Sequence, residues 1–438
     1  MPEIKDHEQF IQWFRHSSPY INTHRGKTFV ILFDGKVINS DLFPEIIHDF
    51  ALLNSLGIKL VLIFDACKNI DSALEAANIK TQKINDLRIT SINALEIIKQ
   101  TIGSIKLKIE AMLSMGVINS PMSGALLNVV SGNFITAKPI GVQNGTDFLY
   151  TGEVRRVDSQ NICKQLDSGA IVLLPAIGYS PSGEIFNLTA QDVTKKTATS
   201  IAADKVIYMT EFGPLKNEKN EMVHQITLAE AKDLSKNSNG KNHPVLITAT
   251  EVCHSGIKRV HLIDVNQKGA LLLELFSRNG VGTLISQESY DAIRNATIED
   301  VGGILELIEP LESQGILVKR SREKLEAEIH HFTVMERDGM IIACAALYPN
   351  KSYKTAELAC LAVHPNYQNE SRGSELLDIL ESQAKQTKMN SLFILTTKSE
   401  HWFVERGFTK SVLSELPDEK KKFYNYQRGS KAFIKTMD

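Results

Sequence analysis

Short apolar runs alternate with amphipathic stretches through the first two-thirds of the chain. Residues 27–38 and 58–66 are dense in Val, Ile, Leu and Phe and predict buried strands, and residues 42–57 between them show a helical period that ends at Gly57. Further apolar runs follow at residues 125–135, 169–186, 204–211 and 257–265. Strands that alternate with helices predict an α/β fold with an open, mostly parallel sheet in three layers, covered by helices on both faces.

A second domain is predicted after residue 296. Thr297 is a candidate helix N-cap, and Asp300 can complete a capping box. Residues 286–296 are the expected linker, so the expected domains are 1–285 and 297–438. Apolar runs at residues 332–339, 340–349 and 355–365 predict an antiparallel meander, and this domain is therefore expected to be α+β.

Length and composition fit a soluble enzyme of two or three domains. The chain has 438 residues, of which 43% are hydrophobic and 23% charged, with a formal net charge of −2. This balance gives no electrostatic reason to expect nucleic acid or an anionic membrane as a partner, and no apolar run reaches the roughly 18 residues of a membrane span. The five cysteines are scattered without zinc-ligand spacing, so we expect buried thiols, a reducing cytoplasm and no metal.

The third strand of the meander leads into a polar loop and an amphipathic helix. The unpaired N–H groups and the positive dipole end of a helix start favour an anion such as a pyrophosphate. Gly373 permits close backbone approach, and Ser371 and Ser374 add hydroxyl donors. Many such joints contain a glycine and bind no ligand, so the pattern by itself leaves both interpretations open.

Residues 368–373 resemble the Gln/Arg-x-x-Gly-x-Gly/Ala signature of the GNAT acetyltransferase superfamily, with Ser371 in place of the first glycine. The resemblance implies that this loop binds the pyrophosphate of acetyl-CoA and that the preceding strand splays open to bind its pantetheine arm. Residues 401–408 resemble the later helix and turn that close over that arm. The implied acetyl-CoA-binding residues are Leu361, Ala362, Val363, Gln368, Ser371, Arg372, Gly373 and Ser374.

A longer resemblance covers nearly the whole chain in the same order. It rests on residues 18–31, 166–173, 269–283, 302–323, 343–349, 357–365, 401–408 and 424–431, which are similar to the bacterial N-acetylglutamate synthase family. That family fuses an amino-acid-kinase-like domain to a GNAT domain. The resemblance implies acetyl transfer from acetyl-CoA to the α-amine of L-glutamate, the first step of arginine biosynthesis.

Four residues align with positions of that family that contact glutamate. Arg320, Arg428 and Ser430 are the implied side-chain contacts, and Cys360 is the implied backbone contact. Guanidinium groups match carboxylates through paired hydrogen bonds, which suits a substrate with two carboxylates. Solvated surface arginines are the alternative, and no cysteine nucleophile is expected.

The implied catalytic residues are Glu357 and Thr396. An α-amine must lose a proton before it attacks a thioester, and Glu357 aligns with the family's general base, acting through water. The alternative is an outward-facing strand residue. Backbone N–H groups near residues 361–363 suit the oxyanion, Thr396 is the candidate donor to the leaving thiolate, and direct transfer in a ternary complex is expected.

The first domain is not expected to phosphorylate anything. Leu32 stands where amino-acid kinases carry a phosphate-binding lysine, Asp34 and Asp65 stand at usual glycine positions, and Gln191 replaces the catalytic aspartate, although Lys205 is retained. A carboxylate there would repel ATP. The resemblance instead implies an arginine sensor and oligomerisation platform.

The resemblance also implies an allosteric arginine site and a homo-oligomer, a hexamer in related proteins. The implied arginine-site residues are His16, Tyr20, Lys258, His261, Glu274, Ser277, Gly280 and Gly282. Glu274 offers a carboxylate to the ligand's cationic end. The alternative is that these residues form structural turns and a solvated glutamate.

Other functions stay open. The acetyltransferase could take another amino acid or a protein amine as acceptor, or the chain could be a non-enzymatic arginine sensor, for which Ser371 is the supporting residue. Leu32, Asp34 and Gln191 disfavour an acetylglutamate kinase.

Overall fold

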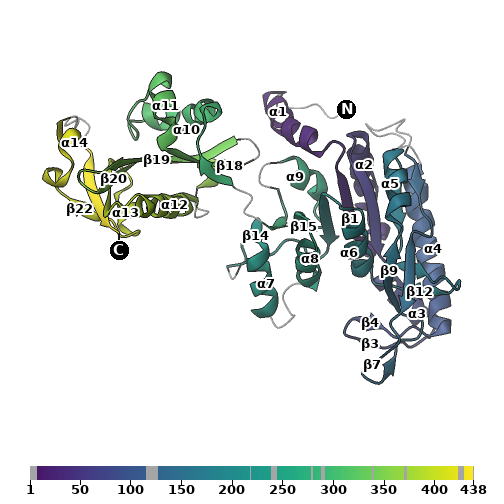
Figure 1. Ribbon diagram of the computed structural model, residues 1–438. Helices are drawn as coiled ribbons and strands as arrows, with labels where there is room; N and C mark the ends of the chain where they lie inside the picture. The colour runs from purple at the N-terminus through teal and green to yellow at the C-terminus, as the bar shows by residue number, and fades with distance from the viewer. Residues whose placement is uncertain are drawn as a thin grey trace. The chain divides into compact units, whose positions relative to one another are not determined.

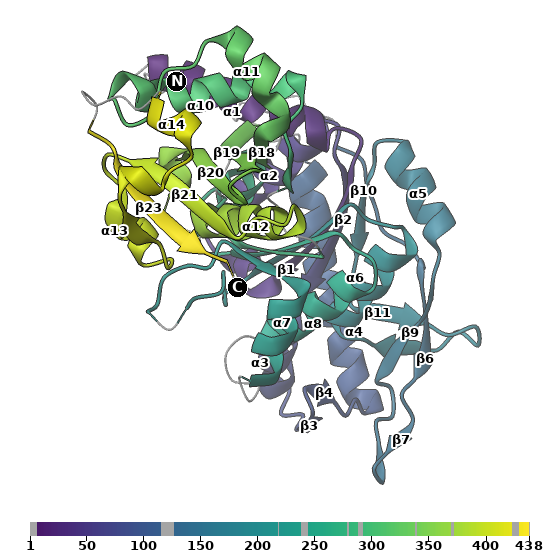
Figure 2. The same ribbon diagram turned by 60° about the vertical axis from the view of Figure 1, so that its left-hand side comes forward.

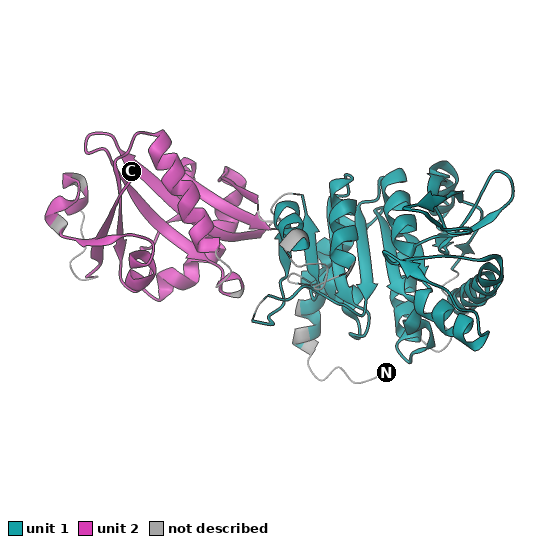
Figure 3. Cartoon of the chain, turned by 90° about the horizontal axis from the view of Figure 1, so that it is seen from below, with its two compact units in different colours: residues 1–289 teal, residues 290–438 magenta. Residues whose placement is uncertain are grey.

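The structure is a computed structural model that describes residues 7–114, 127–217, 219–237, 244–277, 280–287, 292–337, 340–368, 372–422 and 429–437. The chain divides into two compact units, residues 1–289 and 290–438, which we call the first and second units (Figure 3). The predicted fold class is confirmed, because a mostly parallel α/β unit is followed by an α+β unit.

The first unit is built on an eight-stranded sheet with the order β14-β16-β15-β13-β1-β2-β10-β5 (Figure 1). The strands are β1 Thr28–Asp34, β2 Lys59–Asp65, β5 Val129–Val130, β10 Ile171–Leu174, β13 Lys205–Thr210, β14 Gln225–Thr227, β15 Arg259–Asp264 and β16 Thr283–Ser286. All neighbours in this sheet pair in parallel except β15 and β16. The parallel register pairs Asp34 with Asp65, so both carboxylates lie at the carboxyl edge of the sheet.

Successive residues of each strand face opposite cores, which explains why these strands are continuously apolar. Phe29, Ile31 and Phe33 pack with one group of helices, and Val30 and Leu32 pack with the other. The first group is α2 Phe43–Ser55, α3 Cys67–Ala76, α4 Ile92–Ser114 and α9 Ala270–Phe276, and the second is α5 Ser159–Asp167, α6 Ala190–Ser200, α7 Leu228–Asn237 and α8 Pro244–His254.

Smaller sheets complete the first unit. A four-stranded sheet has the order β12-β11-β6-β9, and two hairpins pair β3 with β4 and β7 with β8. These strands are β3 Lys83–Ile84, β4 Leu87–Arg88, β6 Ile135–Pro139, β7 Val142–Gln143, β8 Thr146–Asp147, β9 Gly152–Val157, β11 Ile177–Tyr179 and β12 Ile185–Asn187.

Helix α1, His7–His24, is anchored to the first unit by its carboxyl-terminal half. Ser17 Oγ donates to the Phe276 carbonyl at 3.0 Å, and His24 Nε2 lies 2.9 Å from the Leu275 carbonyl. Its amino-terminal half exposes Phe10, Ile11, Trp13 and Phe14. Among the described helices, none combines the length and apolar character needed to cross a bilayer.

The second unit contains a seven-stranded sheet with the order β17-β18-β19-β20-β21-β23-β22. The strands are β17 Ala292–Asn295, β18 Phe332–Arg337, β19 Met340–Asn350, β20 Thr355–Val363, β21 Ser391–Thr396, β22 Thr409–Ser411 and β23 Lys431–Thr436. The predicted meander is confirmed, because β18, β19 and β20 pair antiparallel in turn. Strand β17 comes from the stretch that the sequence suggested as linker.

Helices cover both faces of this second sheet. Helices α10 Val301–Ser313 and α11 Arg322–Glu328 pack on one face, and α12 Arg372–Gln386 and α13 Glu400–Val404 pack on the other (Figure 2). The predicted capping box is confirmed: Thr297 and Asp300 bind each other's backbone, although they open a 3-10 turn ahead of α10. Helix α14, Asp418–Lys422, follows β22.

Candidate functional site

The second sheet opens beside β20. Strand β20 pairs with β21 only as far as Glu357 and Phe393, yet β20 continues to Val363. Pairing with β19 is also irregular, with a register shift near Cys344 and a left-handed backbone at Cys360, where φ is 54°. Backbone groups of residues 358–363 that face away from β19 therefore have no partner in β21, and they can bind an extended ligand laid in the opening.

A pocket of about 700 Å³ lies at this opening, within the usual size of a small-molecule site. Its lining residues are Leu361, Val363, Tyr367, Gln368, Arg372, Gly373, Ser374, Lys398, Ser399, His401, Trp402, Phe403 and Arg406. The pocket thus brings together six of the predicted acetyl-CoA residues. Ala362 packs its side chain in the core of the opposite face, and Ser371 lies outside the described residues.

The loop that leads into α12 is held by its own side chains. Gln368 Nε2 donates to the Val363 carbonyl at 3.1 Å, and the buried Arg372 guanidinium donates to the Tyr367 carbonyl at 3.3 Å. A Cβ at Gly373 would lie 3.1 Å from Trp402 Cζ2, so glycine there lets the indole pack against the start of α12. These contacts direct the first turn of a 15-residue helix at the pocket.

Two cations that the sequence reasoning did not single out also line the pocket, Lys398 and Arg406. Arg406 Nε donates to Ser374 Oγ at 2.9 Å, and its guanidinium lies 3.9 Å from the Trp402 ring centroid. Positive side chains beside a helix N-terminus suit a phosphorylated ligand. The sequence around Arg406 is that of an ordinary helix end. Its place in the pocket lining becomes evident only from its packing against Trp402.

Glu357 forms the centre of a second polar group on the sheet. It is 7% exposed, which excludes the alternative of an outward-facing strand residue. Tyr348 lies directly opposite it on β19. Lys420 Nζ, from α14, lies 2.5 Å from Glu357 Oε2. The contact is an ion pair. Among the described residues, Glu357 Oε2 has no partner that meets the geometry of a hydrogen bond.

Arg320 lies near the same group and is not a solvated surface arginine. Its Nη1 donates to the Val318 carbonyl at 3.1 Å, while its Nε is buried and, among the residues described, unpartnered. Tyr348 and Cys360 are among its electrostatic neighbours. A partly buried guanidinium whose buried Nε has no partner among the described residues is poised for an anionic ligand.

The other predicted acceptor-site residues are placed in part. Ser430 is buried just after Gly429, whereas Arg428 lies outside the described residues. Thr396 ends β21 and accepts a hydrogen bond from the Ser399 N–H at 3.1 Å, which leaves its own hydroxyl proton to donate. The neighbouring Thr397 Oγ1, which sequence reasoning missed, is buried with no partner among the described groups.

The carboxyl edge of the first sheet is filled by protein charges. Asp34 accepts from the Lys36 N–H and Asp65 from the Cys67 N–H, each at 2.9 Å. Burial, and secondarily the nearby Asp34, raise the pKa of Asp65. Lys68 pairs with Glu211.

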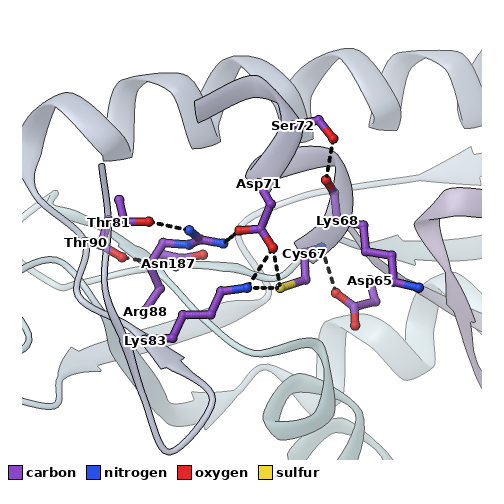
Figure 4. Close-up of polar contacts among 10 residues, drawn as sticks. All are labelled: Asp65, Cys67, Lys68, Asp71, Ser72, Thr81, Lys83, Arg88, Thr90 and Asn187. Carbon is purple, nitrogen blue, oxygen red and sulfur yellow. Dashed lines mark hydrogen bonds and ion pairs between the residues drawn. The ribbon is translucent and has the colours of Figure 1, made fainter. Parts of the chain in front are cut away.

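An ion-pair cluster continues along α3. Figure 4 shows Lys83 Nζ donating to Asp71 Oδ2 at 2.7 Å. Asp71 also pairs with Arg88, and the Arg88 guanidinium donates to Thr81 Oγ1 at 2.7 Å. Lys68, Lys83 and Arg88 are thus already paired with carboxylates, which disfavours their binding of nucleotide phosphates.

The predicted arginine-site residues are brought together in part. His261 Nδ1 lies 2.6 Å from Glu274 Oε1, and the backbone N–H groups of Val281 and Gly282 donate to Oε2 at 2.8 and 2.7 Å. Burial opposes the ionisation of Glu274, but these donors outweigh it and hold its pKa below the ordinary value. Glu274 is therefore not the solvated glutamate of the alternative interpretation, because it holds the loop at residues 280–282; its role toward a ligand stays a prediction.

The remaining predicted members of that site lie around this loop or on the surface. Gly280 has a φ of 60°, and a Cβ there would clash with Glu274. Ser277 donates to the Leu273 carbonyl at 2.5 Å. Tyr20 is partly buried on α1, and His16 and Lys258 are exposed. Across the described ranges, no group of three or more His, Cys, Asp or Glu side chains is arranged for a metal.

Comparison with known proteins agrees with this two-unit organisation. The amino acid kinase family matches residues 27–264, and the acetyltransferase (GNAT) family matches residues 303–408. An amino-acid acetyltransferase from Azotobacter vinelandii is 48% identical over 432 residues, which cover 98% of this chain and 99% of the relative.

Two solved structures are similar over the whole chain. The crystal structure of N-acetylglutamate synthase from Neisseria gonorrhoeae complexed with coenzyme A and L-arginine has a TM-score of 0.86 at 34% identity. The same enzyme complexed with coenzyme A and N-acetyl-glutamate has a TM-score of 0.63 at 35% identity. Each alignment covers 98% of this chain and 99% of the other.

Proposed function

The chain belongs to the amino-acid acetyltransferase family, and on this premise we propose that it transfers the acetyl group of acetyl-CoA to the α-amine of L-glutamate. The observation that carries the proposal is the buried carboxylate of Glu357 beside the opening of β20, with the unpartnered guanidinium donor of Arg320 nearby. An acid beside a free arginine donor suits an acceptor that brings both an amine and a carboxylate.

Acetyl-CoA binds, in this proposal, in the pocket at the start of α12. The helix N-terminus, Lys398 and Arg406 hold the pyrophosphate. Residues 361–363 bind the pantetheine arm through their backbone, because β21 does not occupy that side of β20. The thioester then lies beside the strand that carries Glu357.

The chain's own groups move the protons. Glu357 takes a proton from the α-ammonium group, directly or through a water, and the freed amine attacks the thioester carbonyl. Backbone N–H groups near Leu361 stabilise the oxyanion. The C–N bond forms first and the C–S bond then breaks. The leaving thiolate receives a proton through the hydroxyl of Thr396 or Thr397, which regains one from the attacking nitrogen, so that the products are a neutral amide, a thiol and a protonated Glu357. Arg320, with Arg428 and Ser430, holds the carboxylates of glutamate.

The first unit is proposed to be the regulatory part. L-Arginine binds near His261, Glu274 and the glycine loop at residues 280–282, and it inhibits acetyl transfer. The exposed aromatic residues at the start of α1 support a homo-oligomer, with a hexamer as the proposed state. The five cysteines are free thiols, which suits the reducing cytoplasm as the proposed location.

Kinetics of Arg320→Ala test the substrate assignment. Loss of a charge-assisted contact worth about 1.5–3 kcal/mol should raise the KM for glutamate by roughly 10- to 150-fold and leave the KM for acetyl-CoA unchanged. Arg322→Ala is the matched control, since Arg322 is exposed and pairs with Glu326 within α11. Equal changes in both KM values would contradict the role of Arg320.

A second candidate function keeps the chemistry and changes the acceptor. The carboxylate of Glu357 and the guanidinium of Arg320 would also suit the amine and carboxylate of other amino acids. Thiol release measured with each amino acid at fixed acetyl-CoA separates the two, and a preference for a non-acidic acceptor would replace glutamate.

A further inference from the structure

Tyr348, Glu357 and Lys420 form a polar group on one face of the second sheet. The two residues are direct cross-strand partners on β19 and β20, so their side chains share one face of the sheet. Lys420 Nζ lies 2.5 Å from Glu357 Oε2 and 5.8 Å from the centroid of the Tyr348 ring. A carboxylate combined with an aromatic face is a recurring way to bind an ammonium group.

We propose that Lys420 occupies the position of the acceptor's α-ammonium group when no acceptor is bound, and that glutamate must displace it to reach Glu357. The inference rests on the proposed function, in which Glu357 is the base that receives the amine's proton. Lys420 thus competes with the substrate for Glu357, and this competition limits the affinity for glutamate.

Repulsion between like charges should limit the carboxylate of Glu357 to one ammonium group at a time. Glu357 is 7% exposed, and its Oε2 makes no hydrogen bond of good geometry to the described residues. A second ammonium group at this oxygen would lie against Lys420 in a poorly solvated position, where like charges repel strongly. The substrate and Lys420 therefore bind in turn.

Lys420 is placed so that it can leave. Its side chain is 44% exposed, and it extends from the five-residue helix α14. A lysine released from a partly exposed ion pair regains its hydration at small cost. While no acceptor is bound, the pairing of Lys420 with Glu357 also avoids leaving a buried carboxylate without a counter-ion.

The neighbouring lysine gives a matched control. Lys421 lies on the same helix and pairs with Asp418 at 3.0 Å. Both lysines carry the same charge on the same element, so a change confined to Lys420 variants reports the contact with Glu357.

Steady-state kinetics provide the first test. Lys420→Met should lower the KM for glutamate about fivefold or more with the KM for acetyl-CoA unchanged, as expected for the loss of an internal competitor. Lys420→Arg retains a cation, so its KM for glutamate should stay closer to that of the wild type. The KM of the control Lys421→Met should equal that of the wild type. A raised glutamate KM in Lys420→Met would mean that Lys420 binds a substrate carboxylate, and an unchanged KM would mean a surface ion pair; either result overturns the inference.

Amine labelling of the wild-type protein tests the same idea without relying on turnover. The rate at which an amine-specific reagent modifies Lys420 is followed by mass spectrometry with and without L-glutamate, and Lys421 serves as the internal reference. Glutamate should increase the labelling of Lys420 relative to Lys421, and an unchanged ratio would contradict displacement. If the wild type releases no thiol with glutamate, the proposed function fails; if it does and Lys420 behaves like Lys421, only this inference fails.

Discussion

Glu274 allows a prediction whose size follows from its three hydrogen bonds. Glu274→Ala removes the acceptor for His261 Nδ1 and for the N–H groups of Val281 and Gly282. Charge-assisted bonds contribute about 1.5–3 kcal/mol each, and the lower value applies because the buried carboxylate's desolvation cost disappears with it. The sum of the three bonds gives a loss of roughly 4.5 kcal/mol in the free energy of unfolding of the first unit.

Glu274→Gln is the informative comparison. The amide oxygen can accept from both backbone N–H groups, and the amide NH₂ can donate to His261 Nδ1 in the other imidazole tautomer. Three neutral bonds of about half the strength then replace three charge-assisted ones, and the cost should fall to about 2 kcal/mol. Hydrogen exchange of the peptide that covers residues 270–286 measures both variants, and Glu274→Ala should exchange faster there than Glu274→Gln. Equal exchange in the two variants would show that the hydrogen bonds of Glu274 do not stabilise this loop.

Three further predictions concern the second unit and pH. Glu357→Gln should lower kcat at least ~100-fold, as expected for loss of a general base, while coenzyme A binding measured by calorimetry stays unchanged. Gly373→Val should raise the KM for acetyl-CoA about tenfold because its side chain displaces Trp402. Burial, with help from Glu45, raises the pKa of Asp49 from 3.8 to about 7, so the associated stability is present below pH 4 and lost as pH rises through 7. Asp49→Asn should therefore raise the Tm at pH 8 and leave it unchanged at pH 4; the reverse order would contradict the assignment.

Much of the fold could be predicted because its strands are either continuously apolar or arranged in a meander. The strands at Thr28–Asp34 and Lys59–Asp65 are buried on both faces, and a helix with a clear period separates them. The capping box at Thr297 and Asp300 was visible because both partners lie within one turn. Local signals of this kind survive in the sequence.

The contacts that define the candidate site depend on register and on segments far apart in the chain. Tyr348 meets Glu357 only through the pairing of β19 with β20, and Lys420 arrives from α14 near the other end of the domain. Glu274 was predicted from the sequence, but two of its three partners, the N–H groups of Val281 and Gly282, come from a loop whose conformation no periodicity specifies. The residue types indicate what chemistry these side chains can perform, but they do not indicate which protein groups already pair with them.

Thiol release from acetyl-CoA with L-glutamate, measured with and without millimolar L-arginine, is the most direct test of the proposed glutamate acetyltransferase activity. Release should depend on glutamate, fall at least ~100-fold in Glu357→Gln and be suppressed by arginine. Release that is independent of glutamate, or that persists undiminished in Glu357→Gln, would contradict it.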